Sequence, residues 1–267
     1  MSNLKFFKAL VFAIVLCLII PFGKLKASEI DSLENLLISS SLQDTVRVTL
    51  LNQIAYMIIG SDVDKTLRYA TEAEEIAKKI NYKKGEAESI RLIGIYHNIK
   101  AEYEKAIQYY QKSLEINEEI QYKNGIAKSL NNIGLIYWVQ SNYTAAFEYY
   151  QKSLIICEEL DDKIGIQKAL SNIGLIFSIQ NDFTQAIDYY QKALKINEEI
   201  DYKVGVSNCL NNLGNSSISL NNLSDALNYY QKALIINKGL GDSRLISDCL
   251  NNLGLTYYKK KEYDRAL

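Results

Sequence analysis

Histidine is the side chain that most often serves in acid–base catalysis, and this sequence of 267 residues contains one, His97. A catalytic histidine needs a nucleophile within reach and a third group that orients it. His97 takes a place that Tyr137, Phe177 and Tyr257 also take, at multiples of 40 residues. The sequence also contains no phosphate-binding loop, zinc-protease motif or nucleophile elbow. We therefore expect His97 to pack between helices and the chain to be no enzyme.

Three cysteines follow residue 27, namely Cys157, Cys209 and Cys249. An odd number cannot form a self-contained disulfide framework, and their spacing does not match a zinc site. We interpret them as small buried side chains and expect neither a metal nor a cofactor. Pairs of acids such as Glu118 and Glu119 recur near helix ends, where a solvated face explains them better than paired-carboxylate chemistry.

Asparagines recur two residues before a repeated glycine, with a second asparagine often preceding the first. The first series is Asn132, Asn172, Asn212 and Asn252, and the second is Asn131, Asn211 and Asn251. An amide donates and accepts hydrogen bonds at once, so it can bind a peptide main chain without reading its sequence. The alternative is that these side chains bond neighbouring helices, since buried polar groups need partners.

A period of 40 residues organises the chain, and self-similarity of this kind is the signature of a repeat protein. The recurring residues are Gly94, Gly134, Gly174, Gly214 and Gly254, a second glycine set at Gly85, Gly125, Gly165 and Gly205, tyrosine pairs beginning at 109, 149, 189 and 229, and alanines at 106, 146, 186, 226 and 266. No insertion interrupts the period from Gly85 onward. A single proline and 20 tyrosines favour a helical chain.

Each unit reads as two helices, and residues 126–165 show the pattern. Apolar residues spaced by three and four predict a first helix over Ile126–Gln140 and a second over Tyr143–Leu160. Ser141 and the asparagine after it predict the turn between them. Gly165 is expected to take the left-handed conformation that ends a helix.

Small residues on both helices predict a close approach inside each hairpin. Gly134 on the first helix and Ala146 on the second leave room that Tyr137 and Tyr150 would fill. One such hairpin cannot bury both of its faces, so its stability must come from stacking against neighbours.

The pattern resembles the tetratricopeptide repeat in its longer, 40-residue variety, of the exported bacterial type. In the unit above, the residues that match the family signature are Leu130, Ile133, Gly134, Tyr137, Tyr143, Ala146, Tyr150 and Ser153. The family's usual proline is absent, and a Lys-x-Gly turn is expected to replace it. The resemblance implies an all-α fold, a right-handed superhelical α-solenoid of stacked helix-turn-helix hairpins.

The resemblance also implies that the first helices line a concave groove in which partners bind as extended peptides. The groove residues expected on this basis are Asn132, Asn172, Asn212, Asn252, Asn131, Asn211, Lys128, Lys168 and Trp138. Trp138 is the only tryptophan, and it would be a natural anchor if exposed. The alternative for Trp138 is packing between helices.

The domain organisation follows from the period. The expected segments are a signal peptide at 1–27, a short capping helix at 28–45, a degenerate first repeat at 46–85, full repeats at 86–125, 126–165, 166–205 and 206–245, and an incomplete last repeat at 246–267. Thr66 and Ile54 replace small residues in the degenerate repeat. Because the last hairpin stops early in its second helix, we expect more chain to follow in the natural product.

The N-terminus has the layout of a secretory signal peptide. Lys5 and Lys8 precede an apolar run over Ala9–Ile20, and Ala27 offers a cleavage site. An uncleaved N-terminal anchor is the alternative. Removal of residues 1–27 takes four lysines and changes the net charge from -1 to -5, which gives no reason to expect nucleic-acid binding.

These observations predict a non-catalytic scaffold that binds a protein or peptide partner outside the cytoplasm, whether periplasmic, membrane-associated or secreted. One alternative is the external sensor of a membrane signalling receptor, of histidine kinase, cyclase or transcription-regulator type, whose C-terminal part is missing. A third interpretation is that the stack mediates only self-assembly. Attachment to the membrane would come from the N-terminus or from a segment beyond Leu267.

Overall fold

The computed structural model describes residues 27–38 and 42–266, and within these ranges the ordered elements are all helices. Their bounds are α2 (Ala27–Leu37), α3 (Asp44–Ile58), α4 (Val63–Lys79), α5 (Lys83–Ile99), α6 (Tyr103–Glu119), α7 (Lys123–Val139), α8 (Tyr143–Glu159), α9 (Lys163–Ile179), α10 (Phe183–Glu199), α11 (Lys203–Ser219), α12 (Leu223–Leu240), α13 (Ser243–Lys259) and α14 (Tyr263–Ala266). The expected all-α fold is confirmed. Residues 1–26 of the predicted signal peptide lie outside the described residues.

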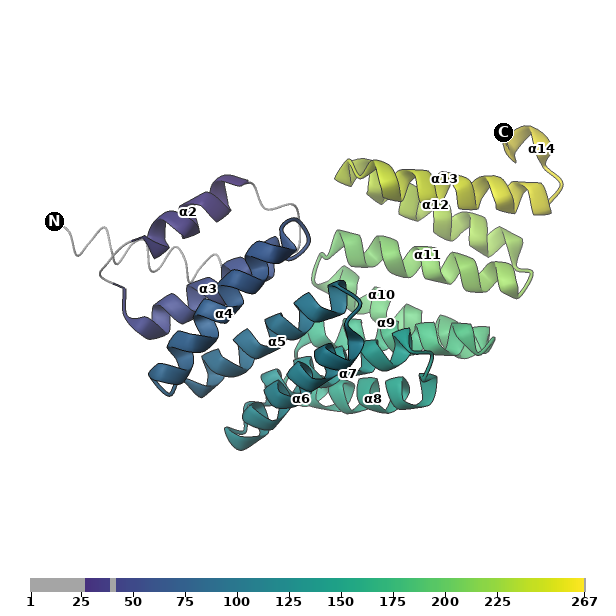
Figure 1. Cartoon of the computed structure of the whole chain (residues 1–267). Coiled ribbons are helices and arrows are strands. Elements are labelled where there is room, and N and C mark those ends of the chain that lie inside the picture. Colours follow the sequence, from purple (N-terminus) through teal and green to yellow (C-terminus); the bar gives the residue numbers. More distant parts are fainter. Residues whose placement is uncertain (1–26, 39–41, 267) are drawn as a thin grey trace. The chain divides into compact units, whose positions relative to one another are not determined.

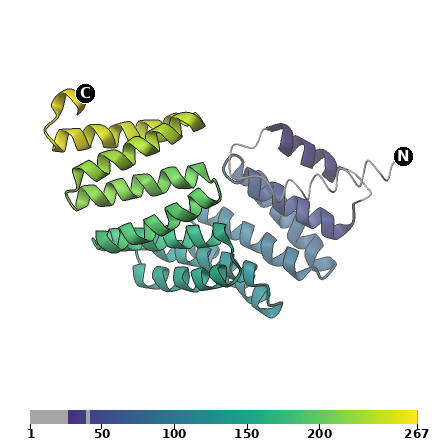
Figure 2. The same cartoon turned by 180° about the vertical axis from the view of Figure 1, so that it is seen from behind.

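The helices form two compact units, of which the first ends at Gly125 and the second begins at Ile126. In each unit, consecutive helices pack against one another as antiparallel hairpins, for example α3 with α4, α5 with α6, α9 with α10 and α11 with α12. Figure 1 shows this succession, and Figure 2 shows it from behind. The second helix of one hairpin also packs against the first helix of the next, as α10 does against α11. This is the stacking that the repeat pattern predicts.

A left-handed residue follows each complete repeat helix from α4 to α13. Ser141 has φ 61° between α7 and α8, and Asp161 has φ 50° between α8 and α9. In this conformation the main-chain N–H of Asn142 donates to the carbonyl of Tyr137 at 2.8 Å, which closes the end of α7. Asn142 then caps α8, because its side-chain oxygen accepts from the N–H of Ala145.

The expectation that Gly165 would end a helix is wrong. Gly165 lies in the first turn of α9, which begins at Lys163, and the left-handed residue is Asp161. The expectation that the Lys-x-Gly sequence replaces the family's proline at the end of a helix is also wrong, because this sequence begins the next helix. Glycine is required here by packing, since a Cβ on Gly165 would lie 2.3 Å from Cys157 Sγ. The equivalent glycines, Gly125 and Gly205, face asparagine side chains in the same way.

The close approach within a hairpin is confirmed, and one ring fills it. A Cβ on Gly134 would lie 2.8 Å from Cε1 of Tyr150, whose side chain is 1% exposed. Ala146 is fully buried beside it. Ser153 links the same two helices, because its hydroxyl donates to the carbonyl of Ala127 at 2.9 Å. Tyr137 stacks instead on Tyr149.

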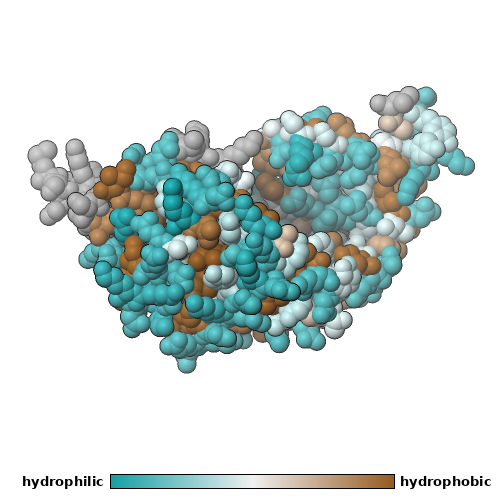
Figure 3. Space-filling model, viewed as in Figure 1, coloured by the Kyte–Doolittle hydropathy of each residue, from teal (hydrophilic) through white to brown (hydrophobic). Residues whose placement is uncertain are grey.

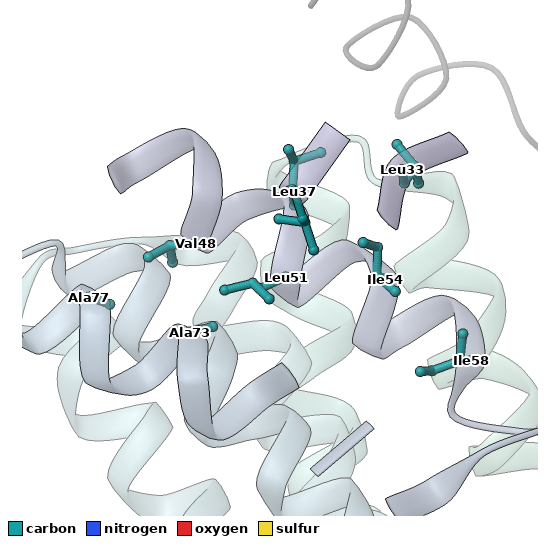
Figure 4. Close-up of a cluster of buried hydrophobic side chains, with 9 residues drawn as sticks. Leu33, Leu37, Val48, Leu51, Ile54, Ile58, Ala73 and Ala77 are labelled. Atoms are coloured by element: carbon teal, nitrogen blue, oxygen red, sulfur yellow. The ribbon is translucent and has the colours of Figure 1, made fainter. Parts of the chain in front are cut away.

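The first unit has a core of its own between α2, α3 and α4 (Figure 4). The buried residues labelled in that close-up are Leu33 and Leu37 of α2, Val48, Leu51, Ile54 and Ile58 of α3, and Ala73 and Ala77 of α4. In the α3–α4 hairpin the residue sizes at these two positions of the repeat are reversed. Ile54 stands where other repeats have glycine and Ala70 where they have tyrosine, and both are fully buried. This exchange explains why the first repeat departs from the pattern.

Hydrophilic residues cover most of the surface seen in Figure 3, with hydrophobic patches between them. In the part of the chain that the structure describes, no helix combines the length and apolar character that crossing a membrane requires.

Candidate functional site

A groove of about 810 Å³ lies over the second unit. Its lining comes from the inner faces of α7, α9, α11 and α13, which are the first helices of successive hairpins, together with Tyr202 at the start of α11. Amides dominate the lining: Asn131, Gln167, Asn172, Asn208, Asn211, Asn212, Asn215, Asn251 and Asn252. The repeat places one or more of these amides on every first helix, because the period of 40 returns each to the same face.

Few other groups share the groove. Lys168 lies on α9, and Arg244 and Asp248 lie on α13. The Arg244 guanidinium is 3.7 Å from the Asp248 carboxylate, and both side chains are largely exposed. Three leucines, Leu135, Leu175 and Leu245, complete the apolar part of the lining. The surface is therefore suited to polar, hydrogen-bonding ligands more than to an apolar anchor.

Several of the predicted asparagines bond neighbouring helices. Nδ2 of Asn172 on α9 donates to Oδ1 of Asn131 on α7 at 3.1 Å. Nδ2 of Asn211 on α11 donates to the carbonyl of Ser207, and its Oδ1 accepts from Cys249 Sγ on α13 at 3.4 Å. These three asparagines therefore bond residues of their own and neighbouring helices, which is the alternative to peptide binding given in the sequence analysis.

Asn212 and Asn252 make no such contact. Both line the groove and are half-buried. Among the described residues, neither side-chain amide makes a hydrogen bond. The main-chain carbonyl of Asn252 accepts from Thr256, but its side chain is not involved. The two amides therefore present a donor and an acceptor each to whatever enters the groove.

Three predicted site residues lie outside the groove lining. Lys128 is exposed on α7. Asn132 has its Nδ2 buried without a hydrogen-bond partner among the described residues. Trp138 is half-buried and packs against the cluster formed by Ala146, Tyr150, Ile173 and Ile176. The structure thus places Trp138 in helix packing, with its Nε1 buried and unpaired within the described part of the chain.

The sequence interpretation missed some of the lining. Asn208 and Asp248 occupy the same place in the repeat as Lys168, so the period could have identified them. Gln167 immediately precedes that place. Arg244 carried no such signal, because the equivalent residues of the two preceding repeats are Ile164 and Val204.

His97 lies in the packing slot predicted for it. Its ring stacks on Tyr109 with centroids 5.0 Å apart and planes at 13°, as Phe177 stacks on Tyr189 at 5.4 Å and 17°. Its Nδ1 is 2.7 Å from the Glu102 carboxylate at the next turn. This geometry holds the ring in the packing between helices.

The three thiols are buried and free, as expected. Burial raises the pKa of each of Cys157, Cys209 and Cys249. They are consequently protonated near neutral pH and are poor nucleophiles there. Within the described residues, no group of histidine, cysteine, aspartate or glutamate is arranged to hold a metal ion.

Stacked hairpins with an amide-lined groove over their first helices define a helical repeat scaffold. Sequence profiles of the tetratricopeptide repeat match residues 92–120, 125–199, 165–238 and 247–267. The chain belongs to the tetratricopeptide repeat family, and it is a protein-interaction scaffold. No curated protein sequence matches it significantly.

Solved structures share the fold at low sequence identity. BtubC from P. vanneervenii is 20% identical with a TM-score of 0.68, over 77% of this chain and 87% of that one. A signal transduction ATPase with numerous domains and a tetratricopeptide repeat sensor, from Pyrococcus horikoshii, is 19% identical with a TM-score of 0.69, over 88% of this chain and 37% of that one. A Rap protein complexed with Competence and Sporulation Factor is 14% identical with a TM-score of 0.67, over 88% and 76% of the two chains. At these identities the likeness extends to the fold alone.

Proposed function

We propose that this chain is a non-catalytic scaffold that binds an extended segment of a partner protein or peptide in the groove of the second unit, outside the cytoplasm. The observation that carries the proposal is the pair of half-buried amides, Asn212 and Asn252, which line the groove and make no side-chain hydrogen bond among the described residues. A polar group held in this state gains most from a ligand that donates and accepts hydrogen bonds.

An extended main chain has the matching chemistry. It presents a carbonyl and an N–H at every residue and advances about 3.3 Å per residue. First helices of successive hairpins are in side-chain contact, since Asn211 of α11 bonds Cys249 of α13. Amides on α11 and α13 would therefore meet successive polar groups of one extended main chain.

Two further observations support the proposal. The Rap protein of the same fold was solved in complex with Competence and Sporulation Factor, so a stack of this kind can hold a partner. The basic start at Lys5 and Lys8, the apolar run over Ala9–Ile20 and the small residue Ala27 support export. Detection of a mature N-terminus after Ala27 in the cell-envelope or secreted fraction would test the location.

The first testable prediction concerns the two amides. A partner captured from the cell envelope with residues 28–267 should bind the Asn212→Ala, Asn252→Ala double variant about 10-fold more weakly or worse, because two hydrogen bonds of roughly 1 kcal/mol each are lost. Isothermal titration calorimetry with the purified partner measures the difference. Asn228→Ala is the matched control, since Asn228 is an exposed asparagine of α12 in the same unit.

Asn172→Ala serves as a second comparison, because Asn172 already bonds Asn131 and its loss should act through the helix packing. If the double variant keeps its helical circular dichroism and binds the partner as tightly as the parent chain, the groove proposal is wrong.

A second candidate is the sensor portion of a signalling receptor. It is supported by the structural likeness to a signal transduction ATPase that is described as having a tetratricopeptide repeat sensor. An apolar stretch of about 20 residues downstream of Leu267 in the natural product would favour this candidate, since a helix of that length spans a membrane. In either case the groove would be the binding surface.

A further inference from the structure

A row of exposed side chains changes its charge along the groove of the second unit. The row is formed by the residues at one place of successive repeats, namely Lys128 on α7, Lys168 on α9, Asn208 on α11 and Asp248 on α13. The last three line the groove, and Lys128 lies outside the lining. From α7 to α13 the formal charge of the row therefore passes from positive through neutral to negative.

Contacts between the first helices fix their order along the groove. The hydroxyl of Ser171 on α9 lies 4.0 Å from Cys209 Sγ on α11. Oδ1 of Asn211 on α11 accepts from Cys249 Sγ on α13 at 3.4 Å. Figure 1 likewise shows α11 between α9 and α13. The basic and acidic ends of the row therefore lie on either side of α11.

These charges are important for selection, because most of the groove lining does not distinguish one ligand side chain from another. Amides dominate the lining, and an amide bonds a main chain whatever side chains that chain carries. Selection then depends on the lining leucines and on the charged groups, which are Lys168, Arg244 and Asp248. Complementary charge across an interface adds specificity and fixes the register in which a partner binds.

The acidic end of the row already has a cation beside it. The Arg244 guanidinium lies 3.7 Å from the Asp248 carboxylate, and the two side chains are 76% and 58% exposed. An exposed ion pair of this kind contributes little to stability. Asp248 can therefore exchange Arg244 for a basic residue of a ligand.

We propose that the segment bound in the groove carries an acidic side chain that pairs with Lys168 and, further along the same extended chain, a basic side chain that pairs with Asp248. This inference rests on the proposed function, since it names the chemistry of the partner that the same groove binds. A segment of uniform charge meets one favourable and one unfavourable end, whereas a segment with its charges in the matching order meets two favourable ends. The row of charges thereby also fixes the direction in which the segment lies.

The test first isolates ligands of the groove and then examines their charge. A random peptide library displayed on phage is selected against the purified chain. Peptides are retained if their binding falls about 10-fold or more with the Asn212→Ala, Asn252→Ala variant, which identifies them as groove ligands. We expect the retained peptides to carry an acidic and a basic residue, separated along the peptide and in one consistent order.

Exchange of the two charges in the chain makes the result specific. A retained peptide should bind the Lys168→Glu, Asp248→Lys variant about 10-fold more weakly or worse, and the same peptide with its own acid and base exchanged should show the opposite preference. The matched control is Asp188→Lys with Lys192→Glu, which exchanges an exposed ion pair of α10 outside the groove lining and should change neither affinity. Fluorescence anisotropy of labelled peptides measures the affinities, and circular dichroism verifies that each variant is folded.

Arg244 supplies a test in which the two explanations differ in sign. Arg244→Gln removes the competitor of the ligand's basic residue, so a retained peptide should bind about 2- to 5-fold more tightly. A groove that only attracts acidic ligands predicts weaker binding instead, because the variant loses a positive charge.

The results separate this inference from the proposed function. Retained peptides without opposite charges, or equal binding to the parent chain and the charge-exchanged variant, would refute the inference and leave the proposed function standing. Weaker binding to Arg244→Gln would also refute it, since Asp248 would then receive no basic residue. If no selected peptide depends on Asn212 and Asn252, the proposed function fails and the inference fails with it.

Discussion

At the scale of single residues, the ends of the helices require a left-handed conformation that asparagine and aspartate tolerate but several other residues there do not. Within residues 27–38 and 42–266, nine non-glycine residues have positive φ, and Ala101, with φ 58°, has no side chain that compensates for it. The left-handed conformation costs an ordinary residue roughly 1 kcal/mol or more, whereas asparagine tolerates it. The left-handed conformation of Ala101 allows the end of α5 to close, because the N–H of Glu102 can then donate to the carbonyl of His97 at 2.8 Å.

Ala101→Gly should therefore stabilise the first unit by about 0.5–1 kcal/mol, because the relief of strain exceeds the added entropy of the unfolded chain. Urea denaturation followed by circular dichroism measures the change. Asn81→Gly, in the same unit and with φ 55°, is the control and should change stability by a few tenths of a kcal/mol. A loss of stability in Ala101→Gly would show that strain at this residue is not the dominant cost.

At the scale of the helical hairpin, two equivalent positions of the repeat carry one small and one large residue, and the order of the two sizes differs between the first repeat and the later ones. Gly174 of α9 faces Tyr190 of α10, whereas Ile54 of α3 stands opposite in sequence register to Ala70 of α4. Interiors are packed to a density at which added or removed volume is felt at once. We therefore expect the summed volume at the two positions to matter more for stability than which helix carries the larger residue.

Transfer of the first-repeat pair into a regular repeat tests this. Gly174→Ile alone should cost more than about 2 kcal/mol through overpacking, since even a Cβ would lie 2.8 Å from the Tyr190 ring. Tyr190→Ala alone should cost about 3–5 kcal/mol by leaving a cavity. The double variant should be more stable than the sum of the two losses by about 1–3 kcal/mol. A double-mutant cycle in urea measures the coupling, and simple additivity would refute the shared-volume explanation.

The same scale shows what the sequence could and could not predict. The 40-residue period predicted the helices, their buried faces and the close approach at Gly134, because all of these follow from spacing alone. It could not distinguish the two uses of glycine at 165, since a residue without a Cβ serves a left-handed turn and a tight contact equally well. It could not separate Asn172 from Asn212 either: their positions in the repeat are identical, but only Asn172 has an asparagine, Asn131, at the right place on the preceding helix.

At the scale of the whole molecule, each regular repeat buries a tyrosine, so the repeats share a sensitivity to high pH, at which phenols ionise. Burial raises the pKa of Tyr230 to about 12 and also raises the pKa of Tyr110, Tyr150 and Tyr190 well above the usual value. Burial raises the pKa of the three thiols in the same direction. Folding keeps all of these groups neutral. Each is buried between packed helices, so its ionisation would place a charge inside the stack.

The chain should therefore unfold in alkali. A group whose pKa is higher when folded than when unfolded contributes stability that is complete below the unfolded pKa and is lost as the pH rises toward the folded pKa. For tyrosine the loss begins near pH 10. We expect cooperative loss of helical circular dichroism between about pH 10 and 12, coincident with phenolate absorbance. Tyr150→Phe keeps the ring, removes one ionising group and should move the midpoint to higher pH. Tyr258→Phe, at a ring that is 62% exposed, is the control and should leave the midpoint unchanged; equal shifts in both variants would show that burial of the phenols does not drive the transition.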